Sequence, residues 1–434
     1  MKRLSVLLLR CLMMAVLLRS PFSVAGSAGH LEAAQGNGLL PVDPARTLST
    51  SQALQPLRTV MTGKTARLTP RQPELVSHFG HAIAIDGNTA VIGAPRSEAG
   101  RGAVYIFVRQ GESWRETSRL VASDRAANDA FGQSVSISGA TIAVGASGHD
   151  ALGYETGAVY VFRYDQGNWV QSQKLLPASP HDVRFGWSVA IAGQTMVVGA
   201  PYRYSQGEMN KIGSATIYAN KGQGWQKQAR LTSRRSGGAA NSDLFGWAVA
   251  VQESTVAIGA HLAEAVYLYQ LSNGRWQQEM VLRGKGPKAH FGYSVSLANG
   301  LLAIGAPAAN QPAMRSGAAY VYVRQANGWS GTAQINPGSL PPGSRFGWSV
   351  ALQDDRLVVG ARESRGRTGE EQAGGVYIFH IQNDTPLLIE KIFASNPAPF
   401  DHFGHAVAIS ADSIVVGAPG RDIQPGSIHI IGRE

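Results

Sequence analysis

Four histidines are the residues best suited to hold a metal ion. His78 and His81 flank one Phe-Gly pair, and His402 and His405 flank another near the end of the chain. If the two segments are neighbours, four imidazoles could bind Zn²⁺, which favours tetrahedral nitrogen ligands. The alternative is that each histidine recurs only because a repeat recurs. At the position of His78, other copies of that repeat have Ala130, Arg184, Leu244, His290 and Arg345. We therefore expect no bound metal and no cofactor.

Tyrosine and arginine gather on segments that we interpret as surface loops. Tyr202-Arg203-Tyr204 stands out, because Tyr and Arg are favoured anchors at interfaces. The candidate binding residues are Tyr202, Arg203, Tyr204, Arg362, Arg365 and Arg421. The alternative is that these segments are ordinary solvated loops.

These residues belong to a repeated unit that begins with Phe-Gly and closes with Gly-Ala. Its seven copies start at Phe79, Phe131, Phe185, Phe245, Phe291, Phe346 and Phe403. In every copy the Phe precedes the closing Gly by 14 residues, whereas successive copies lie 46 to 60 residues apart. A rigid motif with variable spacing of this size is typical of propellers and solenoids.

Each copy contains four strand-like segments joined by turn residues. In the first copy, His81–Ile85 alternates bulky and small side chains, and Thr89–Ile92 is almost wholly apolar. A third strand begins at Gly102, and a fourth, opened by Trp114, ends near Leu120. Seven such units predict an all-β fold, a seven-bladed β-propeller of four-stranded antiparallel blades.

The seventh copy ends just after its third strand. The segment that runs from Thr59 to Leu68 is a candidate for the missing fourth strand, since its Arg67-Leu68-Thr69 resembles the end of an ordinary fourth strand, Arg230-Leu231-Thr232. An open ring would leave an unpaired edge, and this N-terminal strand would close it.

The motif residues are interpreted as structural. We expect Phe79 and its equivalents to fill the seams between blades. Gly80 would allow a close backbone approach or a dihedral closed to other residues. The residue after each Phe-Gly pair is expected to pack near one rim of the central channel, the alternative being an aromatic cage for a ligand. These residues are His81, Gln133, Trp187, Trp247, Tyr293, Trp348 and His405.

The repeats resemble the FG-GAP repeats of the integrin α N-terminal β-propeller and of bacterial secreted proteins. The resemblance runs from Phe79 to Glu434, and Pro follows Gly-Ala in four copies, at Pro95, Pro201, Pro307 and Pro419. It implies a seven-bladed propeller, extracellular, for adhesion or assembly. Integrin-type blades often hold Ca²⁺ in a DxDxDG loop. The corresponding turns here, such as Asp86-Gly87-Asn88, are too short to offer six to eight oxygen ligands.

The first residues have the anatomy of an export signal. Lys2 and Arg3 precede an apolar run, and small residues then suit cleavage near Ala25. We predict a signal peptide at 1–25, a flexible leader at 26–56 and the propeller at 57–434. The protein would then be secreted, in the periplasm or at the cell surface. The only cysteine, Cys11, lies in the signal segment, so no disulfide is expected.

The charge pattern argues against nucleic acid as a partner. The formal net charge is +10, but the basic residues are scattered, without the stripe that nucleic acid requires. No stretch after the signal is apolar enough to span a membrane, and we expect a monomer.

The long connections predict where function lies. Links between strands two and three, and between strand four and the next Phe-Gly, are long and share one face of the disc, whereas the other turns are tight. We expect a non-catalytic propeller that binds a protein or glycan partner through the long-loop face. The alternative is a secreted hydrolase or lyase with a site at the channel mouth. No catalytic motif supports it, although Asp401-His402 near Asp182 or Asp243 is one possible arrangement.

Overall fold

The computed structural model describes residues 65–205, 208–210, 212–233, 242–310, 312–335, 337–338, 340–420 and 425–432. All belong to one compact unit, Arg46–Glu434. The predicted signal peptide and leader lie outside the described residues.

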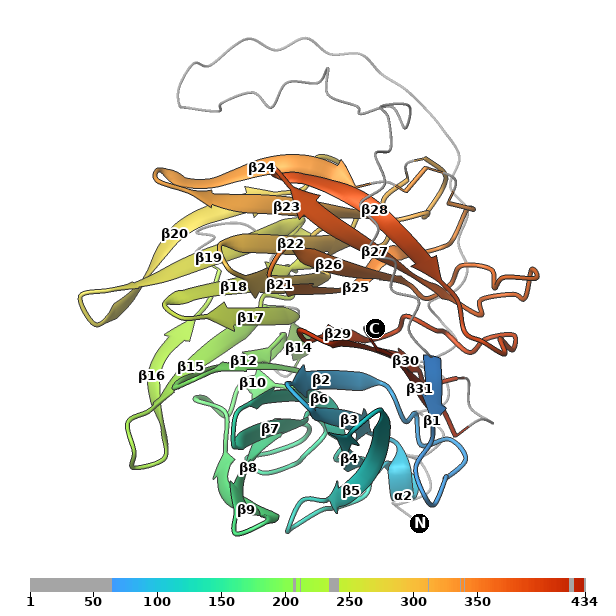
Figure 1. Ribbon diagram of the computed structural model, residues 1–434. Helices are drawn as coiled ribbons and strands as arrows, with labels where there is room; N and C mark the ends of the chain where they lie inside the picture. Colours follow the sequence, from blue (N-terminus) through green and yellow to red (C-terminus); the bar gives the residue numbers. More distant parts are fainter. Residues whose placement is uncertain are drawn as a thin grey trace, which may run out of the picture. The chain divides into compact units, whose positions relative to one another are not determined.

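Seven four-stranded antiparallel sheets form the blades of a propeller (Figure 1). Blade 1 contains β2 (Ala82–Asp86), β3 (Thr89–Ala94), β4 (Ala103–Gln110) and β5 (Ser113–Leu120). Blade 2 contains β6 (Phe131–Ser138), β7 (Thr141–Ala146), β8 (Ala158–Asp165) and β9 (Asn168–Leu175). Blade 3 contains β11 (Ser188–Ala192), β12 (Thr195–Ala200), β15 (Ser214–Asn220) and β16 (Trp225–Leu231). Blade 4 contains β17 (Ala248–Gln252), β18 (Thr255–Ala260), β19 (Ala265–Ser272) and β20 (Arg275–Arg283).

The remaining three blades complete the predicted number. Blade 5 contains β21 (Ser294–Ala298), β22 (Leu301–Ala306), β23 (Ala318–Gln325) and β24 (Gly328–Ile335). Blade 6 contains β25 (Phe346–Gln353), β26 (Arg356–Ala361), β27 (Gly375–Gln382) and β28 (Thr385–Ile392). Blade 7 contains β29 (Val407–Ile409), β30 (Ser413–Ala418), β31 (Ser427–Gly432) and β1 (Thr65–Leu68). The innermost strands contact one another in sequence, and β29 contacts β2, so the ring is closed. The predicted fold is confirmed.

The strand sequences follow the burial that each position in a blade imposes. The second strand of a blade, such as β3, is buried on both faces and consists of β-branched and small residues. The outermost strand alternates instead, so β5 has exposed and half-buried residues in turn. In blades 1 to 6 the outer strand pair carries a register shift at the same place, as between Ile106 and Phe107. Such a bulge increases the local twist of the strands.

The phenylalanine of each motif fills the seam between two blades, as predicted. Phe79 is fully buried and packs on Ile92 and Tyr105 of its own blade and on Val415 and Ile428 of blade 7. All seven equivalents are at most 1 % exposed. The cluster around each of these phenylalanines therefore contains residues of two blades, and the ring joins its blade to the preceding one.

The glycines of the motif meet across every seam. A Cβ added to Gly93 would collide with the carbonyl oxygen of Gly132 in the next blade, and the same holds for all seven Gly-Ala glycines. Within a blade, the Gly80 N–H donates to the Gly93 carbonyl at 3.1 Å. We call these fourteen residues the glycine girdle: Gly80, Gly93, Gly132, Gly145, Gly186, Gly199, Gly246, Gly259, Gly292, Gly305, Gly347, Gly360, Gly404 and Gly417. Gly80 also has φ +91°, so both reasons given for a glycine there hold.

The N-terminal strand completes blade 7, as predicted. β1 pairs antiparallel with β31, with Thr65 opposite Ile431 and Leu68 opposite Ile428. Leu68 also packs against the hydrophobic cluster that surrounds Phe79. The two ends of the described chain thereby seal the ring and leave β31 without a free edge.

A Gly360→Ala variant tests the girdle. The new methyl group would collide with the carbonyl oxygen of Gly404 and with Ser349 Oγ, so we expect the free energy of unfolding to fall by about 1–3 kcal/mol. Urea unfolding measures it. The control is Gly286→Ala, where nothing lies within 4 Å of the added Cβ. Equal stability of the two variants would refute the girdle as a packing constraint.

Deleting residues 57–70 tests ring closure. Loss of β1 exposes the edge of β31, so we expect the melting temperature to fall by roughly 5 °C or more. Deleting residues 26–56, the predicted leader, is the matched control and should leave the melting temperature unchanged. An unchanged melt after the first deletion contradicts closure by β1.

Candidate functional site

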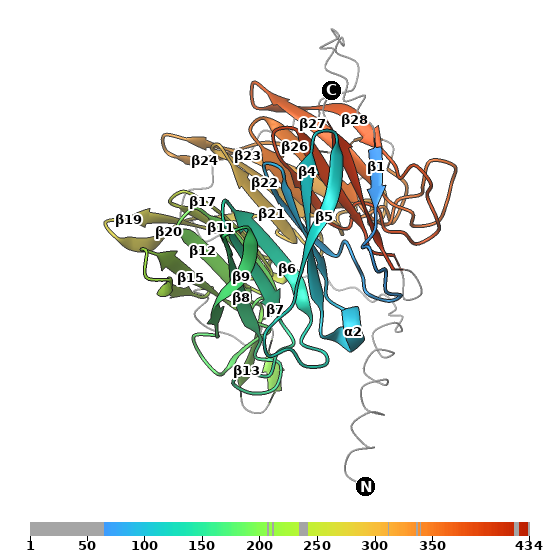
Figure 2. The same cartoon turned by 60° about the horizontal axis from the view of Figure 1, so that its bottom comes forward.

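The long connections share one face of the ring. The turn between β2 and β3 consists of two residues, 87–88, and that between β4 and β5 of residues 111–112. The links from β3 to β4 and from β5 to β6 span residues 95–102 and 121–130. Figure 2 shows two of the long links, the short turn α2 (Ser97–Gly100) and the strand β13 (Tyr202–Ser205), on the same side. This is the loop-rich face that the sequence predicted.

The link after β12 builds a small sheet of its own on this face. β13 pairs with β10 (Asp182–Val183) and with β14 (Glu208–Asn210). Tyr202 lies opposite Val183, and Arg203 lies opposite Asp182. Blade 3 thus carries an extra three-stranded element beyond its four strands.

A turn that recurs in all seven blades surrounds each Phe-Gly pair and directs the side chain of the residue after the pair toward the propeller axis. The residue before each Phe-Gly pair has a left-handed φ between 53° and 63°. Its carbonyl accepts a hydrogen bond of 2.9–3.1 Å from the N–H of the residue after the pair. The turn-forming residues are His78, Ala130, Arg184, Leu244, His290, Arg345 and His402. His78 and His402 are therefore turn residues, at a position where the residue type differs from blade to blade.

The side chains that follow Phe-Gly form an arc around the axis. Ring centroids are 4.7 Å apart for Trp187 and Trp247, 5.4 Å for Trp247 and Tyr293, and 4.6 Å for Tyr293 and Trp348. The arc continues from Trp348 to His405 at 5.9 Å and from His405 to His81 at 4.8 Å. All six side chains are half-buried, and Gln133 occupies the remaining position. We call these seven residues the axial arc. These side chains therefore pack against one another, as expected, and the alternative of an aromatic cage for a ligand stays open.

Two further residues join the arc from the ends of second strands. Arg362 and His261 stand where four other blades have the Pro of Gly-Ala-Pro. The Arg362 guanidinium lies over the Trp348 ring, with Cζ 3.9 Å from the centroid, and its Nη1 is 3.0 Å from His405 Nδ1. His261 packs edge-on against Trp247 at 4.6 Å. His261 was missed by the sequence analysis, although the replaced proline was a usable signal.

The imidazoles of the arc stay neutral, and the positive charge beside them belongs to Arg362. Burial, with smaller effects of His78, Arg362 and Arg96, lowers the pKa of His81 to about 3. Burial also lowers the pKa of His405 well below its usual value, and the neighbouring His81 and Arg362 act in the same direction. Burial lowers the pKa of Arg362, but an arginine stays protonated in proteins.

The four histidines come together without forming a metal site. His81 and His405 are in contact, and His78 and His402 are close enough to influence the pKa of His405. Among the described residues, no three His, Cys, Asp or Glu side chains are grouped to hold a metal ion. His81 and His405 pack against each other, and His78 and His402 are turn residues.

The candidate binding residues divide into those near the arc and those away from it. Tyr202 packs on Trp187 with ring centroids 6.4 Å apart, and Arg362 packs on Trp348. Arg203 is half-buried beside β10, and Arg365 is exposed. Arg421 and the side chain of Tyr204 lie outside the described residues. Tyr202 and Arg362 both lie near enough to affect the pKa of Tyr293, which burial raises.

The three aspartates of the possible catalytic arrangement, Asp182, Asp243 and Asp401, each have a hydrogen-bond partner in a different part of the ring. Asp182 forms a two-pronged ion pair with Arg230 of β16. Asp243 accepts hydrogen bonds from the Ser233 hydroxyl and the Phe245 N–H. Asp401 accepts the Ala398 N–H at 2.7 Å. Each carboxylate therefore stabilises the link of its own blade, which argues against a shared centre.

Blade 2 contains a polar network that the sequence analysis did not identify. Lys174 Nζ lies 2.6 Å from Asp124 Oδ2 and 2.7 Å from His149 Nε2. His149 Nδ1 is 3.1 Å from Asp129 Oδ2, and the Tyr160 hydroxyl donates to Asp124 at 2.7 Å. The network joins the third and fourth strands to both long links. Its charged and polar groups mostly bond to one another.

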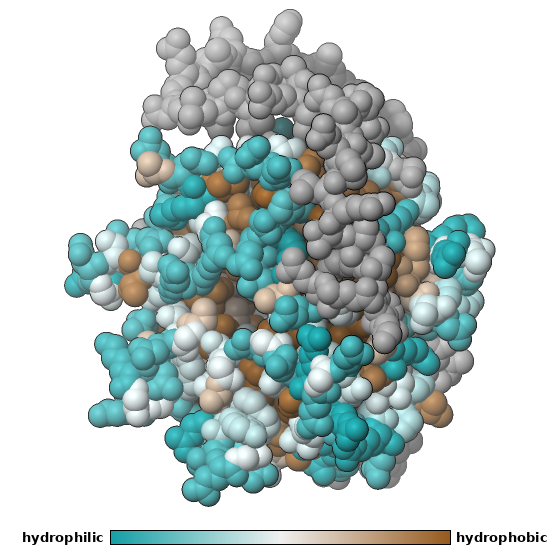
Figure 3. Space-filling view, viewed as in Figure 1, coloured by the Kyte–Doolittle hydropathy of each residue, from teal (hydrophilic) through white to brown (hydrophobic). Residues whose placement is uncertain are grey.

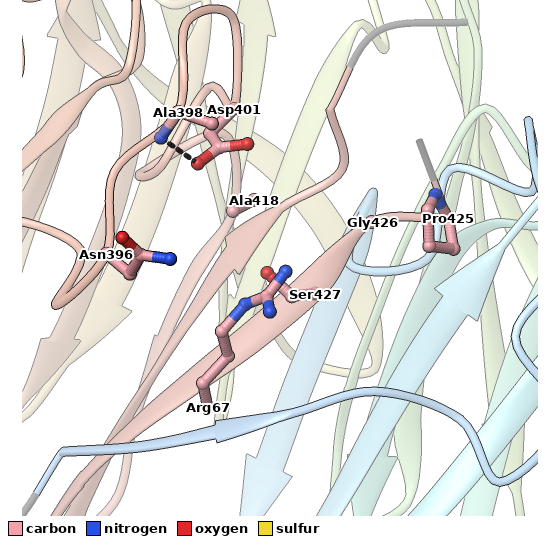
Figure 4. Close-up of a pocket in the computed structure, with 8 residues that line it drawn as sticks. All are labelled: Arg67, Asn396, Ala398, Asp401, Ala418, Pro425, Gly426 and Ser427. Carbon is pink, nitrogen blue, oxygen red and sulfur yellow. Dashed lines mark hydrogen bonds between the residues drawn. The ribbon is translucent and has the colours of Figure 1, made fainter. Parts of the chain in front are cut away.

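Two pockets lie away from the arc. The first, of about 170 Å³, adjoins the closure of the ring, and Figure 4 shows Arg67 of β1 reaching toward Ser427 while Asp401 lies on the opposite wall. The second, of about 570 Å³, is an open groove between the outer strands of blades 3 and 4, lined by Arg230, Tyr269 and Trp276 among others. Figure 3 shows mostly hydrophilic side chains along the outer rim of the visible blades. Neither pocket brings together a set of catalytic groups.

Comparison with known proteins supports the resemblance. A family model described as FG-GAP repeat matches seven times, at residues 62–107, 114–162, 169–218, 225–270, 276–322, 329–379 and 388–431. Each match begins at or near the outermost strand of one blade and ends in the third strand of the next. A search of the curated proteins found no match.

A His81→Gln variant tests the electrostatics of the arc, because Gln already stands at the equivalent position 133. The folded state holds His81 neutral to about pH 3, whereas the unfolded chain protonates it near pH 6.5. The unfolded state then binds more protons between these values, so stability falls as the pH falls through this window. The variant should reduce that slope, by up to about 1.4 kcal/mol per pH unit.

Urea unfolding at pH 7, 5 and 4 measures the slope for the native protein and the variant. His181→Gln, at an exposed histidine, is the control. An identical slope in the native protein and in His81→Gln would mean that His81 is not held neutral.

Proposed function

Because the chain belongs to the FG-GAP repeat family, we propose that it is a secreted, non-catalytic propeller. It binds a protein or glycan partner through its loop-rich face, in adhesion or assembly. The family and the propeller fold fit a protein-binding or adhesion-type domain in general. We propose the class of partner and the face that binds it.

The observation that carries the proposal is the difference between the two faces. One has two-residue turns, such as 87–88, whereas the other has long links of different length and composition in each blade. The link at residues 201–213 pairs with β10 and so adds the sheet of β10, β13 and β14 (Figure 2). Variable loops on a rigid scaffold are where binding residues concentrate.

The chemistry of this face also suits binding. The axial arc offers half-buried Trp, Tyr and His rings beside Arg362. Aromatic and arginine side chains are the residues that dominate binding energy at interfaces. A rigid arc loses little conformational entropy when a partner docks, which favours affinity.

Export is the second part of the proposal. It is supported by the basic start, the apolar run and the small residues near Ala25. Across the described residues, no helix has the length and apolar character needed to cross a membrane.

A binding experiment with loop variants tests the proposal. The full-length protein is immobilised and exposed to biotinylated cell-surface proteins and, separately, to an array of glycans. We expect at least one retained partner, and a loss of retention of about tenfold or more when residues 203–211 are replaced by a short Gly-Ser linker. A loss of 1.4 kcal/mol corresponds to tenfold in affinity.

The control changes the opposite face. Glu112→Lys with Asp384→Lys alters exposed residues in two tight turns, and this variant should retain the partner fully. Melting curves verify that both variants are folded. Retention that depends on the tight turns, or that survives the loop replacement, contradicts the proposal.

A further inference from the structure

We propose that the axial arc is a binding site for an acidic saccharide, a sugar ring that carries a carboxylate, with Arg362 as the anchor of that carboxylate. The inference rests on the proposed function and narrows it to one ligand class at one site.

The arc provides the surface that a sugar ring requires. Six rings follow one another around the axis, and neighbours are tilted by 43–50° instead of lying flat on each other. Tilted rings leave part of each face uncovered, and all six side chains are half-buried, not fully buried. Three of the eight Trp residues of the chain gather here, at Trp187, Trp247 and Trp348. Sugar C–H groups pack against such aromatic faces.

The charge beside the arc is positive. Arg345 and Arg362 share one carboxylate, with 3.3 Å from Arg345 Nε to Glu363 Oε2 and 3.5 Å from Arg362 Nη2 to Glu363 Oε1. Two guanidiniums against one carboxylate leave a net positive charge, and Arg96 adds to the positive field at His81. The neighbouring His81 and His405 contribute no negative charge. An anionic group is therefore favoured at this point.

Arg362 is already fixed in place for such a group. Its guanidinium lies over Trp348, with Cζ 3.9 Å from the ring centroid, and contacts His405, and its side chain remains 20 % exposed. A guanidinium has five N–H donors, and its contacts with His405 and Glu363 leave donors on both Nη atoms for a carboxylate. Four other blades have Pro at this position, and the remaining two have Ser147 and His261, so only blade 6 has an arginine there.

The backbone of the arc favours a saccharide over a peptide. A peptide that binds as an added strand gains affinity through main-chain hydrogen bonds. All seven backbone N–H groups of the arc already donate to the carbonyls of the turn residues. The arc thus offers ring faces and a guanidinium, but no free row of main-chain donors.

Trp fluorescence titration tests the inference on the full-length protein, with trigalacturonate as the acidic probe and maltotriose as the neutral one. We expect trigalacturonate to change the emission saturably and to bind at least tenfold more tightly than maltotriose. Added salt should weaken the acidic probe and leave the neutral one unchanged, since the carboxylate contact is ionic.

Matched variants locate the site. Arg362→Gln should weaken trigalacturonate binding by about tenfold or more, whereas Arg365→Gln, at an exposed arginine of the same link, should change it less than twofold. Trp187→Gln copies the residue that blade 2 has at position 133 and should weaken both probes. Melting curves confirm folding of each variant.

Three outcomes would overturn the inference. They are no saturable binding of trigalacturonate, equal effects of the Arg362 and Arg365 substitutions, and equally tight, Arg362-dependent binding of a triglutamate peptide. The proposed function is tested separately: a partner retained through residues 203–211 would stand even if trigalacturonate failed to bind.

Discussion

The contact between glycines of neighbouring blades is the constraint on which the molecule depends. In every seam, the carbonyl of a Phe-Gly glycine occupies the space where the preceding Gly-Ala glycine would carry a Cβ. Because the contact is backbone to backbone, it sets the distance between blades independently of side-chain choice. The same contact recurs in all seven seams, which allows seven blades to close into one ring.

The phenylalanine wedges and the turns follow from this contact. Phe-Gly must enter the seam in one orientation, and the left-handed backbone conformation of the residue before the pair sets this orientation. The next residue is then directed to the axis in all seven blades, whatever its type. Blade 4 shows how strictly the seam is kept. It has Glu264 where other blades have Gly, and the Glu264 carboxylate accepts the N–H groups of His290 and Phe291 at 2.9 and 2.8 Å.

A scaffold held by backbone contacts leaves its periphery free to change. The loop-rich face has a three-stranded sheet in blade 3, an ion pair of Arg119 with Glu98 in blade 1 and a five-residue polar network in blade 2. None of these alters the girdle. The axial arc lies between these two extremes: the position of its side chains is the same in every blade, whereas the residue type varies from Trp to Gln.

The sequence by itself determined the fold, the blade count, the wedges and the closure by β1, because these depend on short-range patterns that recur at a fixed spacing. It also placed the residues after Phe-Gly near the axis, since one strand face carries them. It did not show that Arg362 lies on Trp348 and His405, or that His261 packs on Trp247. Those contacts join residues that are 14 to 43 positions apart and separated by links of irregular length. Only the closed ring determines which end of a link meets which neighbouring blade, so the tertiary structure decides these contacts.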